Sequence, residues 1–146
     1  LENMNFRDVI MFYGHEHIRA THPTTFEITK ENYVTPRGDC IIGINSSKAC
    51  YDLPPEIKSK LKTDNVKVSL TIKVGEETFK VLARGSSKLL LIDKKSMVVR
   101  KSDYICPRTL AIKSTASAKD IPRSIIKLLQ NKGSKGLMVI EIFPLP

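Results

Sequence analysis

Features that mark several large protein classes are missing from this sequence. No apolar run approaches the roughly 20 residues that a membrane-spanning helix needs, and the N-terminus has no signal-peptide pattern. We therefore expect a cytoplasmic protein with no membrane partner. The three cysteines, Cys40, Cys50 and Cys106, are an odd number without a close pair. This argues against a disulfide framework or a zinc ribbon and fits a reducing compartment.

Catalytic and nucleic-acid signatures are also scarce. The chain has no Gly-x-Ser-x-Gly nucleophile motif and no glycine-rich phosphate loop. Aromatic residues make up only 6% of the chain and are not interleaved with basic ones, which weakens a stacking surface for single-stranded nucleic acid. No internal repeat, low-complexity tract or interdomain linker is evident. Motifs alone therefore name no reaction.

The composition predicts one globular domain over residues 1–146. With 41% apolar and 27% charged residues, the chain can bury a core without a metal or disulfide. Its net charge of +9 comes from 24 basic and 15 acidic residues, scattered without a basic block. Such a charge fits an anionic small molecule, nucleic acid or an acidic protein partner, and equally a solvated basic surface. One glutamine among many isoleucines and lysines leans towards a thermophile.

Apolar periodicity predicts mostly strands. Apolar and polar residues alternate from Asn65 to Val74, and the chain returns over residues 78–83, which predicts a hairpin. The remaining strands are predicted over residues 6–13, 24–29, 40–44, 89–92, 97–100, 109–113 and 137–143. We expect His15–Ile18 to extend the strand over residues 6–13. Two helices are predicted over residues 54–62 and 120–132, each with proline in its first turn.

These strands are not separated by regular helices, so a parallel, doubly wound sheet is disfavoured. We expect a mainly β protein, an antiparallel β-sandwich or a jelly-roll-like barrel with two short helices packed on it.

The stretch from Tyr13 to Cys40 concentrates groups that bind metals, protons or anions, and it holds all three histidines. On an extended segment His15 and His17 would project from one face, and His22 or Glu27 could complete a divalent metal site of a hydrolase. The spacing supplies only two of the four ligands of a cupin site. The alternative is hydrogen-bonded histidines near a chain reversal.

A second hypothesis is a site for an anionic ligand. Arg and Lys donors beside Ser and Thr hydroxyls can hold phosphate or carboxylate, with acids orienting the cations. Clusters of this kind occur around residues 37–39 and 100–109. The alternative is a set of salt-bridged loops between strands. The candidate ligand-binding residues are His15, Thr24, Thr25, Glu27, Arg37, Asp39, Lys101, Ser102, Asp103 and Arg108.

Several motifs resemble one known family. They are Gly14-His15, Thr21-His22-x-Thr24-Thr25-x-Glu27, Arg37-Gly38-Asp39-Cys40-Ile41-Ile42-Gly43 and Val99-Arg100-Lys101-Ser102-Asp103 followed by Arg108-Thr109-Leu110-Ala111-Ile112. Over nearly the whole chain the sequence is similar to an archaeal family catalogued as domain of unknown function number three-seven-one. The resemblance implies a small archaeal cytosolic protein with a jelly-roll-type β-sandwich, and it brings no known catalytic residues. It also implies Asn in relatives at the place of His17.

Three functions follow as expectations. The first is a small basic cytosolic protein that binds an anionic ligand, namely a nucleotide, phosphate or RNA. The second is a metal-dependent hydrolase that uses the clustered histidines. The third is an adaptor that docks an acidic protein. The sequence leaves the oligomeric state open.

Overall fold

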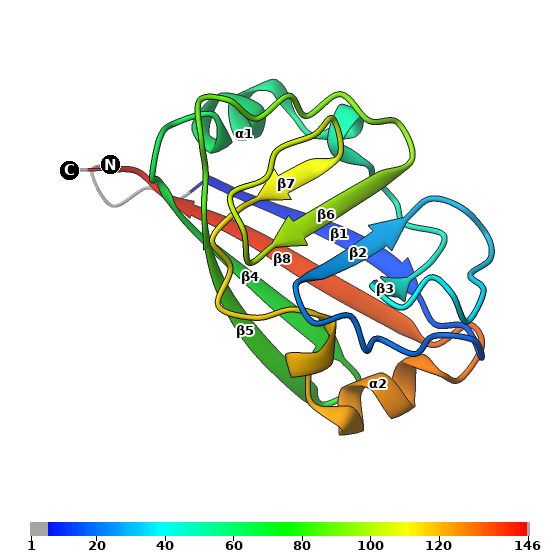
Figure 1. Cartoon of the computed structure of the whole chain (residues 1–146). Helices are drawn as coiled ribbons and strands as arrows, with labels where there is room; N and C mark the ends of the chain where they lie inside the picture. Colours follow the sequence, from blue (N-terminus) through cyan, green and yellow to red (C-terminus); the bar gives the residue numbers. More distant parts are fainter. Residues whose placement is uncertain (1–5, 146) are drawn as a thin grey trace.

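Two four-stranded sheets form the computed structural model, which describes residues 6–145 (Figure 1). Sheet A is antiparallel throughout. In spatial order it contains β1 (Phe6–Tyr13), β8 (Lys135–Phe143), β4 (Lys67–Val74) and β5 (Glu77–Arg84). Sheet B has an antiparallel central pair and two parallel outer pairs. Its order is β3 (Ile41–Gly43), β2 (Thr25–Thr29), β6 (Ser96–Arg100) and β7 (Thr109–Ala111).

Two short helices lie at opposite ends of the molecule, α1 (Pro55–Leu61) and α2 (Arg123–Leu129) (Figure 1). Each follows a turn of 3-10 helix, over Cys50–Asp52 and Ala118–Asp120. Both predicted helices are therefore confirmed. The second is shorter than expected because Pro122 has extended backbone angles (φ −49°, ψ 134°) and breaks the chain between the 3-10 turn and α2.

The fold consists of two similar halves, which we did not expect from the sequence. The first half, residues 6–74, runs β1, β2, β3, 3-10 turn, α1, β4, and the second half, residues 77–143, runs β5, β6, β7, 3-10 turn, α2, β8. The corresponding strands are β1 and β5, β2 and β6, β3 and β7, and β4 and β8. Exchanging each strand for its counterpart reverses the strand order of each sheet, so both sheets have the same twofold arrangement. The expectation of no internal repeat was wrong. The two halves share a short pattern, in which Ile44, Ser46, Asp52, Pro54 and Ile57 recur at the same spacing as Ile112, Ser114, Asp120, Pro122 and Ile125, while most other side chains differ.

Unusual backbone positions recur in both halves and show the correspondence residue by residue. Asn45 and Lys113 both have left-handed backbones, with φ of 50° and 54°. A Cβ atom on Gly14 would lie 2.3 Å from a carbonyl oxygen at the end of α2, and one on Gly85 would lie 2.2 Å from the equivalent oxygen of α1. These glycines allow a close backbone approach.

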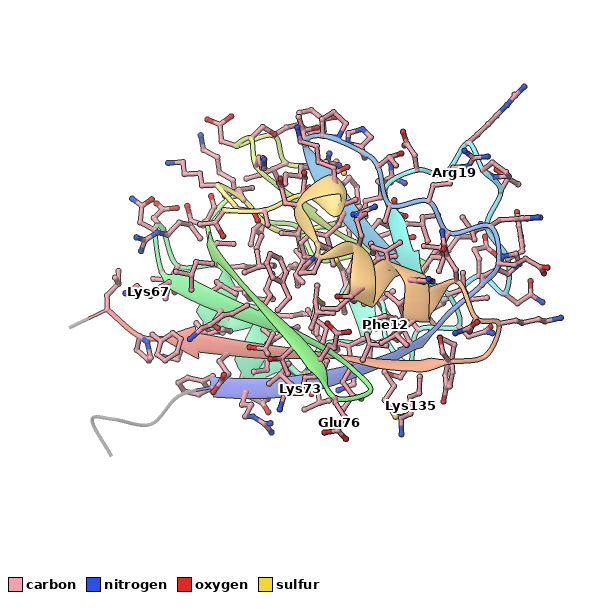
Figure 2. All side chains as sticks on the ribbon, turned by 90° about the horizontal axis from the view of Figure 1, so that it is seen from below. Phe12, Arg19, Lys67, Lys73, Glu76 and Lys135 are labelled. Atoms are coloured by element: carbon pink, nitrogen blue, oxygen red, sulfur yellow. The ribbon has the colours of Figure 1, made fainter. Side chains whose placement is uncertain are left out.

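The largest difference in the core lies around Phe12, which is fully buried (Figure 2). Its ring fills space left open by Gly43 and Gly136, where a Cβ atom would lie 2.1 Å and 2.5 Å from ring carbons. At the related place in the fold the corresponding three residues are Ala83, Ala111 and Val68, all buried. One of these two places therefore holds a large residue and two glycines, and the other holds two alanines and a valine.

Most predicted strands are confirmed, and residues 6–13 match β1 without change. Two predictions were wrong. Residues 89–92 do not form a strand, since Leu91 has φ of 53° although Leu89 and Leu91 are buried. The chain after Gly14 turns at residues 16–17 instead of continuing β1, because the His15 N–H donates to the Leu129 carbonyl over 2.8 Å.

The sheets pack around one apolar core, and the predicted mainly β class is confirmed. Over residues 6–145 they meet at two corners through single bridges, Tyr13 with Ile44 and Arg84 with Ile112, and do not close into a barrel. Jelly-roll connectivity is not confirmed. No helix in this part of the chain has the length and apolar character to cross a membrane.

Candidate functional site

The ten residues predicted to bind an anion do not line one common hollow. His15 lies in one hollow, Glu27 and Arg108 share a second, and Asp103 lies in a third. Lys101 holds a structural carboxylate instead: its Nζ lies 2.8 Å from Oδ2 of Asp120, which also accepts the Ser117 N–H over 2.9 Å. The Lys101 ammonium and the Ser117 amide lower the pKa of Asp120 to about 2.

Two more of the predicted residues, Ser102 and Asp39, form hydrogen bonds within loops. The hydroxyl of Ser102 accepts the Tyr104 N–H over 3.3 Å, and the Asp39 carbonyl accepts the N–H of Thr21 over 2.9 Å. Arg37 is exposed in the turn that the Gly38 N–H closes on the Thr35 carbonyl.

The three histidines do not form a metal site of three ligands. Among residues 6–145 no group of three or more His, Cys, Asp or Glu side chains is placed to hold a metal ion. The rings of His15 and His17 lie 5.1 Å apart between centroids, and Nδ1 of His15 accepts the His17 N–H over 3.0 Å. Nδ1 of His22 accepts both the Thr24 and Thr25 N–H groups over 3.2 Å. Backbone donors thus occupy Nδ1 of His15 and of His22.

The His15 hollow has a volume of about 490 Å³. It lies where the chain leaving β1 meets the turn between α2 and β8, because the Gly14 N–H donates to the Ser134 carbonyl over 2.7 Å. It is thus built from both halves. Its lining residues are Tyr13, Gly14, His15, Asn32, Ile44, Asn45, Lys132 and Gly133.

The Asp103 hollow, about 290 Å³ in volume, occupies the corresponding place in the other half. There the chain leaving β5 meets the turn between α1 and β4, since the Ser86 N–H donates to the Leu61 carbonyl over 3.0 Å. Its lining residues are Asp64, Asn65, Gly85, Ser86, Lys88, Asp103, Ile105, Ile112 and Lys113. The shared backbone around both hollows belongs to the fold, so the side chains that differ between them are the candidates for function.

The main difference between the two hollows is their charge. Lys132 occupies the place of Asp64, and Asn32 occupies the place of Asp103. The His15 hollow therefore contains a lysine and a histidine and no acid among its lining residues, whereas the other hollow is lined by two lysines and two aspartates. In the other hollow, Oδ1 of Asp64 accepts the Ser87 N–H over 2.6 Å, so that acid serves the loop.

The Glu27 hollow, about 270 Å³ in volume, lies on the face of sheet B that points away from the core. Glu27 is only 7% exposed. Its Oε1 accepts the Cys40 thiol over 3.3 Å, and its Oε2 lies 3.8 Å from Nη1 of Arg108. Gly38 and Arg108 both line this hollow, so one residue of each predicted polar cluster reaches it, but Arg37, Asp39 and Lys101 are not among its lining residues.

Ionisation of the cysteines follows their surroundings. Burial, and then the charge of Glu27, raise the pKa of Cys40 to about 12, so its thiol stays protonated and acts as a donor. Burial opposes ionisation of Cys106 as well, but the amide of Arg108, the hydroxyl of Thr109 and the guanidinium of Arg100 outweigh it and lower its pKa. Nη2 of Arg100 lies 3.3 Å from Sγ of Cys106.

Comparison with known proteins agrees with the resemblance seen in the sequence. The model of a domain of unknown function, DUF371, matches residues 10–143. The chain belongs to the DUF371 family. An uncharacterised protein of Methanocaldococcus jannaschii is 46% identical over 122 residues, which cover 84% of this chain and 90% of the relative. Neither DUF371 nor this relative carries an assigned activity, so the function has to come from the site itself.

Sequence reasoning missed Asn32, Asn45 and Lys132, although His15 was among its candidates. Lys132 is distant from His15 along the chain and follows a helix, where a lysine is usually explained by the helix dipole. An alignment of the two halves would have shown it, because Lys132 and Asp64 then stand opposite each other.

Proposed function

We propose that this DUF371 protein binds a small phosphorylated ligand of mononucleotide size in the His15 hollow. The supporting observation is that the His15 hollow has no acid: it has Lys132 and Asn32 where the other hollow has Asp64 and Asp103, which offset the two lysines there, Lys88 and Lys113. A lysine ammonium is a common partner of phosphate.

The lining and the size of the hollow favour a ligand with a planar or apolar part. Tyr13 and Ile44 supply an aromatic ring and an aliphatic wall beside the polar groups, and aromatic rings stack on bases. The side-chain amides of Asn32 and Asn45 can donate and accept hydrogen bonds, as a base edge requires. A volume of about 490 Å³ lies within the range of about 300–1,000 Å³ usual for small-molecule sites.

Thermal unfolding with four nucleoside monophosphates, inorganic phosphate and a short single-stranded RNA tests this proposal. A ligand at 100 times its Kd should stabilise the protein by about 2.7 kcal/mol. We expect at least one mononucleotide to act and inorganic phosphate to act more weakly. A response to RNA alone, with a steep dependence on salt, would move the function to nucleic-acid binding.

A matched pair of variants locates the site. Lys132→Glu should weaken mononucleotide binding about tenfold or more, because a hydrogen bond to a charged group contributes about 1.5–3 kcal/mol. Lys73→Glu makes the same charge change on an exposed position of β4 and should leave binding within about twofold. Equal losses in both variants, or no response to any ligand at low salt, would refute the proposal.

A further inference from the structure

Glu27 is a buried carboxylate at a place where the fold does not require one. Glu27 lies directly opposite Val98 in the antiparallel pair of β2 and β6. Val98 is also its counterpart in the other half, and it is 2% exposed. The second half thus builds the same strand with an apolar side chain. Removing a carboxylate from water is unfavourable unless partners compensate for it.

The partners of Glu27 inside the protein are weak. Cys40 offers a protonated thiol at 3.3 Å, and a thiol is a poor donor. Nη1 of Arg108 lies at 3.8 Å, which is beyond hydrogen-bond distance. A carboxylate can accept about four hydrogen bonds, so Glu27 keeps capacity for strong N–H donors from a ligand.

The surroundings of Glu27 define which ligand fits. Hydroxyls of Thr29 and Ser96 line the hollow beside the carboxylate. Lys95 and Arg108 also line it, and their side chains are 75% and 50% exposed. Nζ of Lys95 lies 3.6 Å from Oε1 of Glu31, a second lining acid whose side chain is 41% exposed. Because an exposed ion pair of this kind is weak, the hollow combines one buried acid with cations that remain accessible to an anionic group. A divalent metal ion fits less well, because the Arg108 guanidinium stands next to the only deeply buried carboxylate among the lining residues.

We propose that the Glu27 hollow binds a small zwitterion, whose ammonium group meets Glu27 and whose carboxylate or phosphate group meets Arg108 and Lys95. The buried acid selects the ammonium end, and the accessible cations select the anionic end. This site is separate from the His15 hollow and has a different ligand chemistry.

Four probe compounds of similar length test both ends of the proposed ligand. The probes are γ-aminobutyrate, 3-aminopropylphosphonate, butylamine and butyrate. Titration of ¹⁵N-labelled protein should shift the amide resonances of Glu27, Thr29 and Ser96 with at least one of the two zwitterions. That zwitterion should bind at least tenfold more tightly than butylamine or butyrate. Equal affinity for the zwitterions and for butylamine or butyrate would overturn the proposal. So would the absence of any resonance shift with each probe up to tens of millimolar.

Variants separate a ligand site from a structural role. Glu27→Gln should weaken zwitterion binding at least tenfold, and Arg108→Gln should reduce the zwitterion to the affinity of butylamine. Glu27→Val introduces the residue of the other half and should fold while losing binding. Glu76→Gln, in the exposed turn before β5 (Figure 2), should bind as the unmodified protein does. Lys132→Glu should also leave zwitterion binding unchanged, so failure of this site and failure of the His15 hollow are distinguishable.

Discussion

The packing of Phe12 against Gly43 offers a quantitative test of the correspondence between the two halves, on which both proposed sites depend. A methyl group at residue 43 would lie 2.1 Å from Cδ1 of Phe12, and the ring is fully buried. Gly43→Ala should therefore destabilise the protein by about 1–3 kcal/mol through overpacking. Phe12→Ala should destabilise it by about 3–5 kcal/mol through the cavity that it leaves.

The double variant distinguishes packing from independent effects. Once the ring is gone, the methyl group at residue 43 meets no ring carbon and fills part of the cavity, as Ala83 and Ala111 do together in the second half. We expect the double variant to be about 1–2 kcal/mol more stable than the sum of the single effects predicts, which lies within the range for residues in contact.

Urea unfolding followed by circular dichroism gives the three free energies, since the chain has no tryptophan for fluorescence. If Phe12→Ala leaves too little folded protein, Phe12→Leu serves in the same cycle. Leu82→Ala, on β5 and 41% exposed, combined with Gly43→Ala is the control and should be additive. Additivity of the Phe12 and Gly43 effects within about 0.5 kcal/mol would refute the packing argument.

Two further predictions follow from the ionisable groups. Because the pKa of Asp120 falls to about 2 when the chain folds, from about 3.9 in unfolded chains, its contribution to stability is complete above about pH 4 and is lost as the pH falls through 2. Asp120→Asn should lower stability by about 0.5–1 kcal/mol at pH 7, because it keeps an acceptor for the Ser117 N–H but removes the partly exposed ion pair with Lys101, and the difference should shrink in acid unfolding curves; a constant difference down to pH 2 would contradict the assignment. Among the cysteines, iodoacetamide at pH 7.5 should label Cys106 first and Cys50 last, because the pKa of Cys106 is lowered while burial above all raises those of Cys40 and Cys50 to about 12. Peptide mass mapping measures the order, the unfolded chain should label evenly, and faster labelling of Cys50 would contradict it.

Local patterns in the sequence predict the strands where burial and hydrogen bonding coincide. The alternation from Val66 to Val74 reports one buried and one wet face, and β4 follows it. The apolar run at residues 89–92 reports burial only: Leu89 and Leu91 are buried, but the left-handed backbone at Leu91 prevents regular strand pairing. Periodicity alone cannot distinguish these cases.

The sequence by itself determined the mainly β class, the two helices and the membership of DUF371. It also placed His15, Glu27 and Arg108 among the candidates. Only the tertiary structure decided which of these residues meet. Strand β8 of the second half pairs with β1 and β4 of the first, and β6 of the second half pairs with β2 of the first. These pairings join chain segments far apart in sequence, and local residue patterns carry no information about them, whereas the β4–β5 hairpin is local and was predicted.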